Sequence, residues 1–214
     1  MTFPINKHSG FLQRIRNFGA NTAGVAAMEF ALVVPIMIGL YFMLNETANG
    51  LRAARKVTMT ARIMADLASR SADLSDAALK DLLDSSGPIF DPFSATTGSF
   101  RITSFRFDAS GKGFVDWSEI RGTGLGARYA RCTPTDALPS NPSLVPIAVP
   151  QGLKIANTSL VLAETMMQYT PSVGWAITGT LDLKDKLYMR PRDSSFVTRA
   201  GVPSPSPLPC PGYT

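Results

Sequence analysis

Cysteine and histidine are scarce in this chain, and their scarcity excludes several kinds of site. The 214 residues include two cysteines, Cys132 and Cys210, and one histidine, His8. A structural zinc site built from cysteine and histidine needs four ligands, so none is expected. A Ser-His-Asp site is excluded once the first 24 residues are removed, because His8 lies among them. We expect a protein that is not an enzyme and has no cofactor.

Acidic residues are absent from the first 24 positions. Met1 to Gly24 carries Lys7, Arg14 and Arg16 and no acid, as the start of an export signal does. These three residues account for most of the formal net charge of +5. The remaining charge is small, so the sequence does not indicate a nucleic-acid partner.

Charge is also missing from a long apolar run. No charged residue occurs from Phe30 to Asn45, and extending the run back to Val25 adds only Glu29. About 20 apolar residues are needed to cross a bilayer, so residues 25–45 are predicted to form a transmembrane helix after a basic leader, residues 1–24. A cleaved secretory signal peptide is the alternative. Its apolar region is usually only about 7–15 residues long, and no small-x-small cleavage site follows this run.

The helical pattern continues past the apolar run. Small or apolar residues recur at steps of three and four, which predicts one helix over 25–69, about 68 Å long. Such a helix is too long for a compact domain and would project or pack along partners, with a kink expected at Pro35. The small residues of its second half predict a helix-packing stripe: Ala54, Ala61, Ala65 and Ala68.

Beyond this helix the pattern indicates a short helix followed by strands. Ser75 would cap a helix over 76–84 that ends at Gly87-Pro88, and residues 46–86 together form a helical extension. Period-two alternation predicts a hairpin, and three later runs predict further strands. These segments are 99–107, 114–120, 145–149, 158–169 and 181–188. The expected fold is α+β, with a β-rich domain over 87–200 and a proline-rich tail over 201–214.

The cysteines bear on which side of the membrane this domain lies. A single Cys132–Cys210 disulfide would suit an oxidising compartment and place the domain outside the cytoplasm. Two unrelated buried thiols are the alternative. The excess of cations on the cytoplasmic side does not decide the orientation, because four cations also follow the apolar run. They are Arg52, Arg55, Lys56 and Arg62.

The turn of the predicted hairpin has the spacing of a calcium-binding loop. Asp108, Ser110, Asp116 and Glu119 occupy positions where that loop has oxygen ligands. Lys112 stands where another ligand belongs, and the flanking segments are predicted to be strands, not helices. We therefore expect a plain Asp/Gly turn and no metal.

Glu29 is unusual because a carboxylate inside an apolar helix is costly and suggests a specific partner. The segment Gly24-Val25-Ala-Ala-Met-Glu29-Phe30 resembles the prepilin-peptidase motif of type IV pilins, where cleavage after the glycine makes the next residue the new N-terminus. Together with Glu164-Thr-Met-Met-Gln-Tyr-Thr-Pro171 and Tyr188-Met-Arg-Pro-Arg192, it resembles the TadE-like proteins of tight-adherence (Tad, or Flp) pili.

The resemblance implies a minor pseudopilin or assembly component that supports pilus biogenesis and surface adhesion. It implies insertion in the bacterial inner membrane with a periplasmic C-terminal domain, and contacts with a prepilin peptidase, the Tad platform proteins, other pseudopilins and the major Flp pilin. Glu29 would pair with the ammonium of Val25 on a neighbouring subunit. Major Flp pilins have tyrosine where this chain has Phe30, which leaves processing open. The alternative is an uncleaved, membrane-anchored periplasmic scaffold or ligand-binding module.

Overall fold

One long helix dominates the N-terminal part of the chain. The computed structural model describes residue 10 and residues 22–93, 98–111, 113–126, 149–172 and 179–200. Helix α2 runs from Thr22 to Arg70, 49 residues, and includes Pro35. The predicted helix over 25–69 is therefore confirmed. The chain divides into two units, Met1–Thr47 and Ala48–Thr214, and we call the second the globular unit.

The globular unit contains a four-stranded antiparallel sheet. Its strands are β2 (Ser99–Phe107), β3 (Gly113–Arg121), β4 (Ser159–Tyr169) and β5 (Leu181–Met189). They are ordered β3-β2-β4-β5, and each neighbouring pair is antiparallel. The hairpin and the last two predicted strands are thereby confirmed, as is the α+β class. The remaining predicted strand, 145–149, lies outside the described residues except for Val149, which is not in a strand.

A short helix and several small elements complete the unit. Ser75 caps α3 (Asp76–Ser86) by accepting a hydrogen bond from the Ala78 amide at 3.1 Å. The 3-10 turn η1 (Gly87–Phe90) follows directly, with Pro88 in its first turn. The other short elements are β1 (Asp73–Leu74), which pairs in parallel with β6 (Thr198–Arg199), and the turn η3 (Gln151–Leu153).

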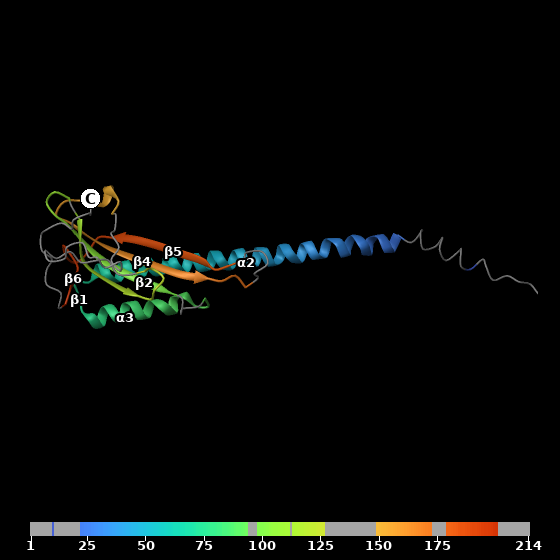
Figure 1. Ribbon diagram of the computed structural model, residues 1–214, viewed down its shortest axis with the longest axis horizontal. Helices are drawn as coiled ribbons and strands as arrows, with labels where there is room; N and C mark the ends of the chain where they lie inside the picture. The colour runs from blue at the N-terminus through green and yellow to red at the C-terminus, as the bar shows by residue number, and fades with distance from the viewer. Residues whose placement is uncertain are drawn as a thin grey trace, which may run out of the picture. The chain divides into compact units, whose positions relative to one another are not determined.

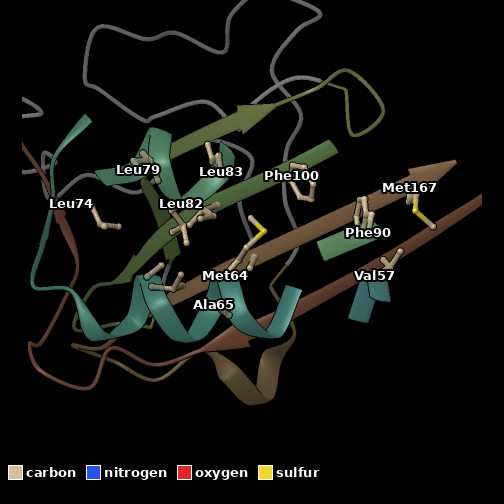
Figure 2. Close-up of a cluster of buried hydrophobic side chains, with 14 of the residues drawn as sticks. Val57, Met64, Ala65, Leu74, Leu79, Leu82, Leu83, Phe90, Phe100 and Met167 are labelled. Atoms are coloured by element: carbon tan, nitrogen blue, oxygen red, sulfur yellow. The ribbon is translucent and has the colours of Figure 1, made fainter. Parts of the chain in front are cut away.

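One face of the sheet packs against both helices. Alternate strand residues, such as Phe100 and Ile102, join Met64 of α2 and Leu82 of α3 in one buried cluster. Figure 2 shows these helical side chains gathered against Phe100 on β2. Burying a side chain of the size of Met64 contributes about 1.5–3 kcal/mol. In Figure 1 the sheet lies alongside the C-terminal part of α2, which therefore supplies a layer of the core.

The opposite face of the sheet carries a second apolar cluster. Phe105 and Phe107, which alternate with the residues of the first face, lie here with Leu160, Leu162 and Val115. Because both faces are covered, β4 is buried at every position but one. The unit therefore begins at Ala48, and the helical extension predicted at 46–86 belongs with the sheet from that residue onward.

Candidate membrane segment and charged sites of the globular unit

The segment that resembles a processing site lies in the first turns of α2. Val25 and Phe30 expose 58% and 70% of their surface, and Glu29 is also exposed. A Cβ atom built on Gly24 meets no atom of the described residues within 4 Å. The helix would accept alanine there and gain roughly 1 kcal/mol in helix propensity. Packing in this part of the chain therefore gives no reason for glycine at position 24.

The apolar stretch that follows is exposed on all sides of the helix. Nearly every large apolar side chain from Val25 to Leu44 is open to its surroundings, and Met28 exposes 77%. An 18-residue window of α2 has a mean hydropathy of 2.1, and none of its residues is buried. A helix that is apolar all round and unpacked suits the interior of a membrane, whether as an anchor or as a signal sequence. Among the described residues, this is the one helix with these properties.

The segment around Arg192, which carries part of the family resemblance, holds the C-terminal end of α2. The Arg192 amide donates to the Ser69 carbonyl at 2.9 Å, and its guanidinium pairs with Asp66 at 3.0 Å. The Ser69 hydroxyl in turn donates to the sulfur of Met189 at 3.1 Å. Arg70 also pairs with Asp66. We call Asp66, Ser69, Met189 and Arg192 the helix-end clamp. It satisfies a carbonyl that the last turn of a helix leaves without a partner.

The other segment that carries the resemblance contains a buried ion pair. Arg101 on β2 and Glu164 on β4 face each other in register, and Arg101 Nε lies 2.6 Å from Glu164 Oε2. Their side chains are only 6% and 11% exposed. Arg101 also donates to the Leu125 carbonyl at 3.1 Å. Burying a charge away from water is costly unless an opposite charge pairs with it. Each of these two side chains therefore needs the other to offset the cost of its own burial.

Tyr188 lies next to this pair on the same face of the sheet. Its hydroxyl is buried without a hydrogen-bond partner among the described residues. Burial, and to a lesser degree the negative charge of Glu164, raise the pKa of Tyr188 above its ordinary value of 10.0. The folded protein therefore keeps the phenolic proton more tightly than the unfolded chain does.

We predict that this tyrosine makes the fold sensitive to alkali. The stabilisation from the raised pKa is complete below about pH 10 and is lost as the pH rises through the folded-state pKa. Tyr188→Phe should flatten the fall in unfolding free energy between pH 9 and 11, measured by urea denaturation at a series of pH values (the ordinary tyrosine pKa is about 10). An unchanged slope in the variant would contradict the assignment.

A cleft of about 320 Å³ lies between α3 and β3. Arg199 bridges its walls, donating to Asp76 Oδ1 and to Glu119 Oε2, each at 2.9 Å. Arg121 of β3 pairs with Asp84 of α3. The acids and cations of the cleft thus neutralise one another and tie β6, α3 and β3 together.

The loop with calcium-like spacing forms a turn between strands, as expected. Asp108 accepts hydrogen bonds from the amide and hydroxyl of Ser110 at 2.8 and 2.7 Å. Asp116 pairs with Arg106 at 2.7 Å, and Glu119 is engaged by Arg199. The described residues contain no group of three or more metal-binding side chains.

The predicted helix-packing stripe lies inside the globular unit, and most of it is buried. Ala61, Ala65 and Ala68 are at most 1% exposed, and Ala54 is half-buried. Ala65 and Ala68 join the buried cluster that α2 shares with the sheet. Packing of the stripe against a partner helix stays a prediction. Cys132 and Cys210 lie outside the described residues.

Two features of these sites were not foreseen from the sequence. The Arg101–Glu164 pair joins residues 63 positions apart, and the Asp66–Arg192 contact joins an even more distant pair. Glu164, at the middle of the mostly apolar strand β4, was the available signal for the first. In the comparisons with known proteins, no family model, no curated protein and no solved structure matches this chain.

Proposed function

We propose that this protein is a minor pseudopilin or assembly component of a Tad (Flp) type IV pilus, anchored in the bacterial inner membrane with its globular unit in the periplasm. The observation that supports this most is the difference between the two halves of α2. Its first half is apolar and exposed all round, and its second half is a core layer of a small sheet domain. A membrane anchor that continues as the spine of a globular unit suits a subunit delivered to a filament from the bilayer.

Two further observations agree with this proposal. Packing among the described residues gives no reason for glycine at position 24, whereas a peptidase that cuts after a glycine does give one. The two distant segments that resemble TadE-like proteins contribute an ion pair and the helix-end clamp to one domain. A role in adhesion and pilus biogenesis would then require no catalytic group.

Glu29 has a specific part in this proposal. After cleavage, its carboxylate would pair with the ammonium of Val25 on an adjacent subunit, which offsets the cost of a charge within the bilayer and sets the axial register. The partners would be a prepilin peptidase, the Tad platform, other pseudopilins and the major Flp pilin. The competing proposal is an uncleaved periplasmic scaffold, for which the same exposed apolar helix would serve only as an anchor.

The test is the N-terminus of the chain recovered from membranes, determined by intact mass and N-terminal sequencing, with and without a prepilin peptidase. We expect a mature chain that starts at Val25 only when the peptidase is present. Gly24→Leu should block the cut, while Glu29→Gln should leave insertion intact and abolish piliation. A wild-type chain that keeps its first residues would favour the uncleaved scaffold, and normal piliation with Glu29→Gln would contradict the pairing mechanism.

A further inference from the structure

The part of α2 that enters the globular unit carries a basic face. Arg52, Arg55 and Arg62 are exposed, and Lys56 is half-buried. They recur at steps of three, four and seven, so they share one side of the helix. No acidic residue occurs from Thr47 to Ala65. We call these four residues the basic face.

The cations of the basic face are not neutralised within the described part of the chain. Arg52 donates to the Asn49 side chain at 3.1 Å, which is an uncharged partner. None of the four forms an ion pair with a described acid, whereas Asp66, further along the same helix, is shared by Arg70 and Arg192. The fold therefore engages the cations at the end of α2 and leaves those at its entry to the unit available.

Chain connectivity keeps the first two of these cations near the end of the apolar run. Arg52 follows Asn45 by seven residues and Arg55 by ten, which corresponds to about 10 and 15 Å of helix. The headgroup layer extends roughly 5–8 Å beyond the hydrocarbon. The remaining distance between the helix and the headgroups is spanned by the length of an arginine side chain together with the Debye length of about 8–10 Å, over which charges still attract. Arg62, about 25 Å along the helix, lies beyond this range.

Apolar side chains accompany the same cations. Leu51 and Met59 each expose 53% of their surface on the part of α2 that the sheet leaves uncovered. A basic helix face with exposed apolar residues suits the boundary between headgroups and acyl chains.

We propose that Arg52 and Arg55, with Leu51, form a docking surface for the headgroups of anionic phospholipids on the side of the membrane where the globular unit lies. This inference rests on the proposed membrane anchoring. The ligand is the phosphate of a lipid within the bilayer, which the guanidinium groups bind through charge-assisted hydrogen bonds. The surface ties the entry of α2 into the globular unit to the membrane surface.

The experiment uses the full chain in nanodiscs of phosphatidylcholine alone or with about 30% phosphatidylglycerol, so that only the second kind of disc attracts cations to anionic headgroups. Phenylglyoxal modifies accessible arginines, and peptide mapping reports each site. We expect Arg52 and Arg55 to react about fivefold more slowly in the anionic discs. Arg62, in the same helix, is the internal control and should react equally in both. Soluble glycerol phosphate added to neutral discs should give no protection.

A second readout uses matched variants. Arg52→Gln with Arg55→Gln should reduce the anionic lipid retained by the chain in native mass spectrometry by about fivefold or more, while Arg62→Gln should leave it unchanged. Equal reaction of Arg52 and Arg55 in both kinds of disc would overturn the lipid surface. Protection that is the same in both discs and grows with protein concentration would overturn it in favour of an acidic face of a second copy. A chain that fails to enter discs at all would overturn the membrane anchor itself, which separates the two failures.

Discussion

Glu164→Gln is expected to lower the free energy of unfolding by about 3–5 kcal/mol, although it changes only one charge and almost no volume. The variant leaves the guanidinium of Arg101 buried, at 6% exposure, with its anionic partner gone. The Leu125 carbonyl, which also accepts from Arg101, does not replace a carboxylate. The loss should be measurable by guanidinium denaturation of the full chain in detergent, followed by tryptophan fluorescence.

The ion pair also predicts a rescue. Replacing both members with apolar residues of similar size, Arg101→Met with Glu164→Leu, should recover most or all of the lost stability, because neither charge is then buried alone. Lys80→Met provides the control, since Lys80 pairs with Asp84 on the surface and is 73% exposed. Its effect should stay below about 1 kcal/mol. A double variant as unstable as Glu164→Gln would mean that the pair contributes by more than mutual neutralisation.

The second large effect concerns the apolar half of α2. Ile36→Arg combined with Leu40→Arg should remove the chain from the membrane fraction, because each arginine near the centre of a bilayer costs about 2.5–3.5 kcal/mol on insertion scales. Both side chains are exposed, so the substitutions remove no packing. Carbonate extraction of isolated membranes measures the retained fraction, and we expect a loss of more than tenfold.

The globular unit supplies a matched control for this experiment. Leu67 and Leu181 are comparably exposed leucines outside the apolar run, at 46% and 41%. Leu67→Arg with Leu181→Arg introduces the same two charges and should leave membrane retention unchanged. If both double variants behave alike, the apolar half of α2 is not a membrane segment, and the proposed anchoring fails.

Periodicity was sufficient to predict the long elements. The absence of charge over 30–45 and the spacing of small residues beyond it indicated α2, and the alternation along 99–107 indicated a strand. That both faces of this strand are covered was learned from the structure. These patterns follow from the local geometry of helices and strands, so they can be recognised without knowing what the element packs against. The same holds for Ser75, whose hydroxyl caps the helix that follows.

Contacts between segments far apart in the sequence could not be predicted from periodicity. The alanines of the predicted stripe have the size and spacing for close packing, but spacing does not identify the partner. Ala65 and Ala68 lie in a cluster with residues of the chain's own sheet. The clamp between Asp66 and Arg192 depends on β5 lying at the end of α2, a matter of topology that single-residue preferences do not encode. The parallel pairing of β1 with β6, only two residues long, has no periodic signal at all.

The clamp at the end of α2 has a mechanical consequence. Within the globular unit, the helix contacts the sheet from Ala53 to Ala68, and the clamp fixes its last turn at Ser69. A pull on the Ala48 end, directed along the helix axis, would load these contacts together in shear, because the clamp holds the far end of the helix at Ser69. Resistance to such a pull grows with the number of contacts that must break at once. Tension along α2 is therefore borne by the buried cluster that the helix shares with the sheet.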